Sequence, residues 1–451
     1  MTADRRSTGP DRSFSGRVMT VFFTQATAAT IGIVNGFVLA RVLGPSAKGD
    51  FYLLTLVPET LMVLLQLGLP QAFGFFAARG QTLGINAKTV TLALALALPT
   101  LAVTIALLPV LQESIFDDLA SAEIILPLLA LPLILNGSFT LNVIIGRRQV
   151  TWYSAVSIGG SLVGLVLYVV LVGVLGLGLR GALVAYLLLA LVQATARLVA
   201  SVAAERRNRD PGRLTYRQLF RYGLPFYPGS LTQYYSYRAD IYLIAWLLVD
   251  ASAALGFYSM AVSMAELVFF VPNAVSTTFF PHVAESTREE ADRMVPTVAR
   301  VTILASAAAA LALVPAAVIL ISVLLPAFRP SLPALFVLLP GVVALSNTKV
   351  LRGYVSGLGR TGLTSIVAIA AFALNIVVNL ILIPRYGIIG AAFASLISYS
   401  ASSIAYSVIA ARLSKARLRD FWLPRPSDVR FTVQTLVGLG GRMWQAARRR
   451  H

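Results

Sequence analysis

Ionisable side chains inside long apolar stretches are the reactive groups of this 451-residue chain. They are the acidic residues Glu59, Asp240 and Glu266 and the basic residue Arg238. Placing such a side chain in a bilayer costs at least about 2.5 kcal/mol. It is therefore expected to form an ion pair, to face a hydrated cavity or to take part in the function of the protein. Because desolvation makes a carboxylate easier to protonate, the three acids are candidates for coupling to H⁺ or Na⁺. The alternative for each acid is a static bond to a neighbouring helix.

Tyrosine is concentrated around Arg238, since seven of the 16 tyrosines lie in the stretch 216–242. At about 100° per residue, a helix here would place four of these side chains on one face: Tyr227, Tyr234, Arg238 and Tyr242. A guanidinium on such a face can fork onto a pair of anionic oxygens. The alternative is that Arg238 pairs with Glu59 or Glu266 and only fastens helices together.

Other polar side chains in the apolar stretches suit a hydrated interior. These are the neutral residues Gln25, Asn35, Asn375 and Asn379, while the ionisable residues Lys349 and Arg352 lie toward the cytoplasmic end of the apolar stretch 333–356. Asn375 and Asn379 are four residues apart and so share one helical face. Neutral polar groups in lipid also join helices by hydrogen bonds, which is their alternative role.

The elements that carry these residues are predicted to be membrane-spanning helices. Hydrophobic residues make up 57% of the chain and charged residues 12%. A hydrocarbon core about 30 Å thick needs about 20 apolar residues per helix. Runs of that length predict an all-α polytopic membrane protein with about twelve spans, at 18–42, 50–77, 89–110, 121–145, 153–175, 180–203, 220–248, 254–279, 297–325, 333–356, 363–383 and 388–411.

The distribution of basic residues predicts the orientation of these spans. With the N-terminus inside, 31 of the 37 Lys and Arg residues, Arg197 and Arg300 among them, fall on the cytoplasmic side. Because such residues bias loops to the cytoplasm, both termini are predicted to be cytoplasmic. Topology therefore explains the net charge of +18, and we expect no nucleic-acid partner.

An internal repeat divides the chain. The segment Ala40–Tyr52 is echoed by Ala245–Tyr258, and Gly178–Ala185 by Gly387–Ala394, at offsets of 206 and 209 residues. An offset of six spans puts both copies in one orientation, the parallel type of transporter repeat. We therefore expect a cytoplasmic arm (1–17), a six-helix N-lobe (18–204), a linker (205–219), a six-helix C-lobe (220–412) and a basic cytoplasmic tail (413–451).

Several short motifs carry a resemblance to a known family. They are Ala40-Arg41-Val42-Leu43-Gly44-Pro45 with Gly49 and Phe51-Tyr52, then Leu67-Gly68-Leu69, Arg238-Ala239-Asp240 and Gly256-Phe257-Tyr258. With them the chain, from about residue 15 to 412, resembles the polysaccharide-biosynthesis (Wzx-type) flippases. These oligosaccharide transporters belong to the MOP superfamily, which also holds the MATE drug exporters and the lipid II flippases.

The resemblance implies two six-helix lobes around a central cavity in the bacterial inner membrane. It also implies alternating-access transfer of an undecaprenyl-diphosphate-linked oligosaccharide to the outer leaflet. The tyrosine rings would then lie against sugars and Arg238 on the diphosphate. Partners would be the polyprenyl-diphosphate-linked glycan, membrane lipids, and a polysaccharide polymerase and glycosyltransferases. The alternatives are a cation-coupled multidrug exporter, which Arg238 disfavours, and a lipid II-type flippase.

Enzymatic chemistry is not expected. The chain has no cysteine and two histidines, His282 and His451, which excludes a thiol nucleophile and a site with three histidine ligands. It contains no GxxxxGK[ST] motif for nucleotide phosphates. We therefore expect no enzyme activity and no cofactor besides a coupling ion.

Overall fold

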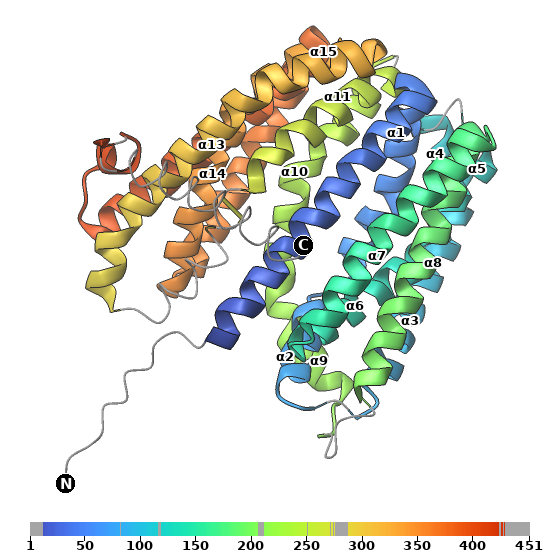
Figure 1. Cartoon of the computed structure of the whole chain (residues 1–451), viewed down its shortest axis with the longest axis horizontal. Coiled ribbons are helices and arrows are strands. Elements are labelled where there is room, and N and C mark those ends of the chain that lie inside the picture. Colours follow the sequence, from blue (N-terminus) through green and yellow to red (C-terminus); the bar gives the residue numbers. More distant parts are fainter. Residues whose placement is uncertain are drawn as a thin grey trace, which may run out of the picture. The chain divides into compact units, whose positions relative to one another are not determined.

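The computed structural model describes residues 12–81, 83–115, 119–205, 212–249, 251–270, 272–273, 275, 287–423, 425–426 and 428 (Figure 1). Most of the predicted arm, part of the predicted linker and residues 429–451 of the predicted tail lie outside this range. Nearly all of the described residues are helical. The chain divides into two compact units, Met1–Tyr234 and Tyr235–His451.

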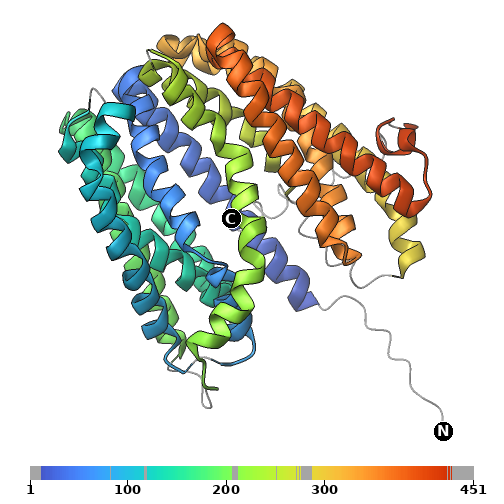
Figure 2. The same cartoon turned by 180° about the vertical axis from the view of Figure 1, so that it is seen from behind.

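The first unit is built from helices that run side by side in both views (Figures 1 and 2). They are α1 (Arg12–Leu65), α2 (Leu69–Ala78), α3 (Ile85–Ala106), α4 (Leu108–Ile115), α5 (Ser121–Leu128), α6 (Leu131–Gly146), α7 (Val150–Tyr168), the π-helical turn η1 (Val169–Val174), α8 (Gly178–Glu205), α9 (Tyr216–Gly223) and η2 (Leu224–Phe226). The boundary between the units falls within α10 (Tyr227–Leu247).

The second unit is also helical. It contains α11 (Ala251–Ala265), η3 (Glu266–Phe269), α13 (Arg288–Leu324), η4 (Pro326–Phe328), α14 (Ser331–Gly357), α15 (Thr361–Ser414) and η5 (Leu418–Phe421). Helices α13, α14 and α15 supply most of its core, in which Tyr354 and Tyr406 are fully buried.

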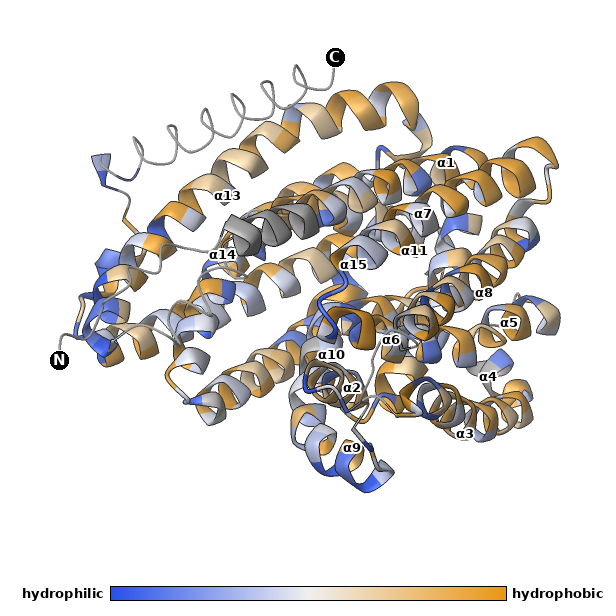
Figure 3. Cartoon of the chain, turned by 60° about the horizontal axis from the view of Figure 1, so that its bottom comes forward, coloured by the Kyte–Doolittle hydropathy of each residue, from blue (hydrophilic) through white to orange (hydrophobic). Residues whose placement is uncertain are grey.

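The helices match the predicted membrane spans. In the described part of the chain, nine helices are long and apolar enough to cross a bilayer, and apolar residues dominate them (Figure 3). Two of the nine are pairs of spans joined at a kink, α1 at Gly44 (φ 73°) and α15 at Gly387 (φ 56°). Glycine permits these turns because it has no Cβ to clash at positive φ. With the less apolar α10, helices lie at all twelve predicted spans, so the all-α polytopic prediction is confirmed.

A close backbone approach fixes the start of α2 against the end of α9 in the first unit. Gly68 has φ 70°, and a Cβ on it would lie 1.9 Å from the carbonyl oxygen of Gly223. Beside it, the rings of Phe75 and Tyr222 stack with centroids 4.1 Å apart. Only glycine at residue 68 allows this contact, which brings α9 and the beginning of α10 against the end of α1.

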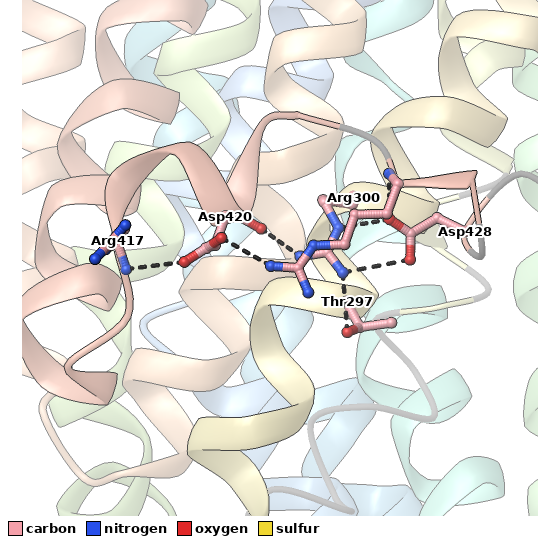
Figure 4. Close-up of polar contacts among 6 residues, drawn as sticks. Thr297, Arg300, Arg417, Asp420 and Asp428 are labelled. Atoms are coloured by element: carbon pink, nitrogen blue, oxygen red, sulfur yellow. Dashed lines mark hydrogen bonds and ion pairs between the residues drawn. The ribbon is translucent and has the colours of Figure 1, made fainter.

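Residues after α15 fold back onto α13 in the second unit (Figure 4). The Arg300 side chain donates from Nε to Asp428 Oδ2 (2.6 Å) and from Nη1 to the Asp420 carbonyl (2.6 Å). Both Arg300 and Asp428 are 3% exposed. Nearer the surface, Arg425 pairs with the Asp420 carboxylate at 2.9 Å. From the sequence, Arg300 was counted only among the positive charges that set the orientation of the spans. In the structure it forms a buried ion pair with Asp428.

Protonation of Asp428 should release this segment. The hydrogen bond from Arg300 lowers the pKa of Asp428 below its ordinary value. A lowered folded-state pKa gives stability that is present above about pH 4, the ordinary aspartate value, and lost as pH falls through the folded-state pKa. We expect hydrogen exchange in residues 415–428 to be independent of pH, after correction for intrinsic rates, between pH 5 and 8, and to accelerate below about pH 4.

Substitution should separate the buried pair from the exposed one. Asp428→Asn leaves a buried guanidinium without its counter-charge, which costs about 3–5 kcal/mol, whereas Arg425→Gln breaks an exposed pair that contributes less than about 1 kcal/mol. The same exchange measurement at pH 7 checks this, with faster exchange expected in Asp428→Asn alone. Equal exchange in the two variants would contradict the assignment.

Candidate functional site

The first two predicted tyrosines of α10 are bonded to helix α1. Tyr227 donates its hydroxyl to the Leu64 carbonyl at 2.7 Å, and the hydroxyls of Tyr234 and Thr60 lie 3.0 Å apart. The third tyrosine, Tyr242, is half-buried. The hydroxyls of Tyr227 and Tyr234 thus fasten α10 to α1 within the first unit, while their rings stay half-buried.

Asp240 lies at the centre of a buried polar cluster in the second unit. It is 5% exposed and accepts a hydrogen bond from the Tyr258 hydroxyl of α11. The Ile241 N–H donates to its Oδ1 at 3.0 Å, and the Ser395 hydroxyl of α15 lies 3.5 Å from its Oδ2. These donors stabilise a carboxylate in an apolar surrounding. The bond from Asp240 to the next span, which the sequence allowed as its alternative role, is present.

The predicted asparagines continue this cluster. Ser398 donates to the Ser395 carbonyl at 3.1 Å, Asn375 donates to the Ser398 hydroxyl at 3.2 Å, and Asn379 donates to Asn375 Oδ1 at 3.0 Å. Asn379 Oδ1 is itself buried and has no hydrogen-bond partner among the described residues. The Asp240 cluster, which we define as Asp240, Ser395, Ser398, Asn375 and Asn379, therefore supplies carboxylate, hydroxyl and amide oxygens. Such oxygens bind a proton or a hard cation.

The predicted cations gather around Glu266 in the same unit. Arg238 Nη1 lies 3.7 Å from Glu266 Oε1, so the predicted alternative pairing is present. Lys349 on α14 interacts electrostatically with Glu266 and with Arg352, and its Nζ lies 2.8 Å from Asn273 Oδ1. We call Arg238, Lys349 and Arg352 the cationic cluster, in which Arg238 and Lys349 are near Glu266 and Arg352 is near Lys349.

This cluster remains accessible. The Arg238 and Glu266 side chains are 25% and 45% exposed and their charged atoms are 3.7 Å apart, so the pair is loose and partly exposed. A pair of this kind contributes little to stability, about 0–1 kcal/mol. An anionic ligand with several oxygens can therefore compete with Glu266 for Arg238 at small cost.

The other predicted residues lie in the first unit. Gln25 donates to the Tyr153 hydroxyl at 3.3 Å and Asn35 to the Ser161 carbonyl at 3.4 Å, so both connect α1 to α7. Glu59 lines a cavity of about 350 Å³ between α1, α6 and α8. The structure thus brings Asp240, Asn375 and Asn379 into one group within the second unit, and Gln25, Asn35 and Glu59 belong to the other unit.

Sequence reasoning missed three neutral groups at this site: the cluster members Ser395 and Ser398, and Tyr258, which donates to Asp240. Tyr258, Ser395 and Ser398 sit in apolar helices and carry no charge, so nothing in hydropathy distinguishes them from other small or aromatic residues. Ser395 and Ser398 are three residues apart on one helical face, which is the one signal that could have indicated them.

The fold and these clusters define a multi-pass helical membrane protein whose two units both contain buried polar groups. A family model described as "Polysaccharide biosynthesis protein" matches residues 38–327. The chain therefore belongs to this polysaccharide biosynthesis family. No curated protein matches the sequence.

Solved structures with the same fold are transporters and a flippase. The lipid II flippase MurJ in an inward closed conformation is 13% identical with a TM-score of 0.68, covering 93% of this chain and 91% of that one. An outward-facing MATE multidrug transporter of the MOP superfamily is 16% identical with a TM-score of 0.64, covering 89% and 97%. A Vibrio cholerae MATE transporter is 15% identical with a TM-score of 0.60, covering 89% and 97%. At these identities the similarity establishes a MATE-like fold.

The charge on Asp240 can be tested by comparing two buried tyrosines. Tyr258 donates to the Asp240 carboxyl and Tyr406 to the Thr364 carbonyl at 3.1 Å, and both are about fully buried. A hydrogen bond to a charged acceptor contributes about 1.5–3 kcal/mol and one to a neutral acceptor about 0.5–1.5 kcal/mol. We expect Tyr258→Phe to lower the thermal unfolding temperature in detergent more than Tyr406→Phe. An equal decrease of the unfolding temperature in the two variants would mean that Asp240 is protonated, and so neutral, in the folded protein.

Proposed function

We propose that this protein is a flippase that moves an undecaprenyl-diphosphate-linked oligosaccharide from the cytoplasmic to the outer leaflet by alternating access. The observation that carries the proposal is the partly exposed cationic cluster in a membrane unit of a polysaccharide-biosynthesis protein. Several guanidinium and ammonium groups beside one carboxylate suit a diphosphate, because arginine forks onto paired phosphate oxygens.

Within this proposal Arg238, Lys349 and Arg352 bind the diphosphate. Arg238 leaves Glu266 as it engages phosphate oxygens, and Lys349, which also lies 3.8 Å from the Phe269 ring centroid, supplies a second cation. The half-buried rings of Tyr227, Tyr234 and Tyr242 suit the faces of sugar rings. Gln25 and Asn35 are proposed as polar contacts for the substrate within the first unit, and Asn375 and Asn379 within the second.

Transport would be coupled to H⁺ or Na⁺ through a buried carboxylate. Asp240 is favoured because it is buried with oxygen donors from α15, whereas Glu266 is engaged with Arg238 and is more exposed. Glu59 remains a candidate because it lines a cavity in the first unit. Asn379 Oδ1, which accepts no hydrogen bond from the described residues, is a further oxygen of the Asp240 cluster that a cation could bind.

Two other functions belong to the same fold. A cation-coupled multidrug exporter would need an anionic site, which the surplus of positive charge in the cationic cluster opposes. A lipid II-type flippase would bind the same diphosphate and differ in the sugars recognised.

The proposal also includes the location of the protein and its partners. Both termini would be cytoplasmic, and the protein would lie in a bacterial inner membrane and have no enzyme activity. Its partners would be glycosyltransferases and a polysaccharide polymerase.

Loss of Arg238 should impair transfer of the lipid-linked substrate. In proteoliposomes with a fluorescent polyprenyl-diphosphate oligosaccharide, we expect Arg238→Ala to lower the rate of leaflet exchange at least tenfold, because a diphosphate contact is lost. The matched control is Arg329→Ala, which removes a surface cation of the same unit. Equal rates for wild type and Arg238→Ala would refute the diphosphate role. Exchange of lipid II alone, or export of cationic dyes alone, would favour the other two functions.

Coupling should depend on Asp240. We expect wild-type exchange to accelerate several-fold when a H⁺ or Na⁺ gradient is imposed, and Asp240→Asn to exchange at the same rate with and without the gradient, because an amide cannot bind a proton or neutralise a cation. Glu59→Gln is the parallel variant in the first unit. Gradient dependence that survives in Asp240→Asn and is lost in Glu59→Gln would transfer the coupling role to Glu59.

A further inference from the structure

Arg197 is a basic residue of helix α8 that the proposed function does not use. It lies six residues before the end of the apolar stretch Gly178–Ala203. Its Nη2 donates to Gln193 Oε1 at 2.8 Å, while its Nε is buried and has no hydrogen-bond partner among the described residues. No ion pair of Arg197 is formed among those residues either. Arg197 is only half-buried, so its positive charge can still attract an anionic acceptor from the cavity that it lines.

The direction of the Arg197 side chain is unusual for an arginine whose only role is to set the orientation of the helix in the membrane. An arginine near the end of a membrane helix normally extends outward so that its charge reaches the interface. Arg197 is bonded instead to Gln193, one turn nearer the middle of the bilayer. With a rise of 1.5 Å per residue, Arg197 lies about 10 Å from the middle of the stretch, and so about 5 Å inside the edge of the hydrocarbon.

Two glycines on neighbouring helices make room for this arrangement. A Cβ on Gly137 of α6 would lie 3.0 Å from Arg197 Nη1, and a Cβ on Gly160 of α7 would lie 3.0 Å from Gln193 Nε2. Any larger residue at either position would press on the polar pair. The space that Arg197 and Gln193 occupy in the first unit therefore depends on glycine at both positions.

Arg197 lines the cavity of about 350 Å³ between α1, α6 and α8. Along α8 the lining extends from Tyr186 to Arg197, eleven residues or about 16 Å. Most of the remaining lining is apolar, including Ile134, Leu141 and Leu189, and Glu59 is its one carboxylate. The cavity is thus long and mainly apolar, with a cation at the end toward which α8 runs.

We propose that this cavity binds a lipid phosphate group, with the Arg197 guanidinium as the cation that holds the phosphate and part of the attached chain lying along the apolar lining. A guanidinium just inside the edge of the hydrocarbon can donate hydrogen bonds to a lipid phosphate at the membrane surface. The methylene groups of the lipid chain can then pack against the apolar lining of the cavity. Glu59 disfavours a second negative charge within the cavity, so a single phosphate on an apolar chain fits better than a soluble polyanion. The proposal holds whichever glycan the protein moves.

The test measures binding of defined lipids to the delipidated full-length chain in detergent by native mass spectrometry. The probes are phosphatidylglycerol, a polyprenyl monophosphate, diacylglycerol and inorganic phosphate. We expect one saturable site for at least one phosphate-bearing lipid and none for diacylglycerol. The tighter of the two phosphate-bearing lipids identifies the source as a membrane phospholipid or as the spent carrier of glycan transfer.

Variants assign the site to Arg197. Arg197→Gln should weaken binding at least tenfold, and Gly137→Ala, which displaces Nη1, should weaken it several-fold in a chain that keeps its arginine. Arg180→Gln is the matched control, since Arg180 lies on α8 but is 74% exposed and pairs with Glu123. Unchanged affinity in both Arg197→Gln and Gly137→Ala overturns the proposal. Equal binding of diacylglycerol, or binding of inorganic phosphate alone, overturns it as well.

Discussion

The cost of placing charge in hydrocarbon governs the interior of this protein. Each ionised group in an apolar helix must find donors, acceptors or a counter-charge, because lipid supplies none. Asp240 meets this requirement with hydrogen bonds from the Tyr258 hydroxyl and the Ile241 amide. Arg300 meets it with Asp428, and Arg238 with Glu266. These partners join separate segments of the chain within the second unit.

The same constraint separates groups that hold the fold from groups available for function. Arg300 and Asp428 are buried with close bonds, so the pair fastens the segment after α15 and is expensive to break. Arg238 and Glu266 are 3.7 Å apart and partly exposed, so they can exchange partners at small cost. The diphosphate that we propose as the transported group would need the second kind of site, because a substrate must be released as well as bound.

Glycine complements these polar contacts by allowing close approach. Gly44 and Gly387 turn long helices into pairs of spans, and Gly68 lets its backbone meet that of Gly223. Gly137 and Gly160 leave the volume that Arg197 and Gln193 occupy. Small residues are common where membrane helices approach closely, and here two of them also leave room for Arg197 and its partner Gln193.

The sequence by itself determined the all-α membrane fold, its twelve helical segments and the polysaccharide-biosynthesis family. Hydropathy and the repeat act over tens of residues, so they are readable without contacts. It also singled out Asp240 and Arg238, because a charge in an apolar run is conspicuous. The pairing of Arg238 with Glu266 was among the alternatives that the sequence offered, but only the tertiary structure decided the partners of Asp240, since Tyr258 is neutral and Ser395 lies 155 residues away. For the same reason Arg197, which in sequence resembled an orienting charge, proved to line a cavity whose other walls come from distant helices.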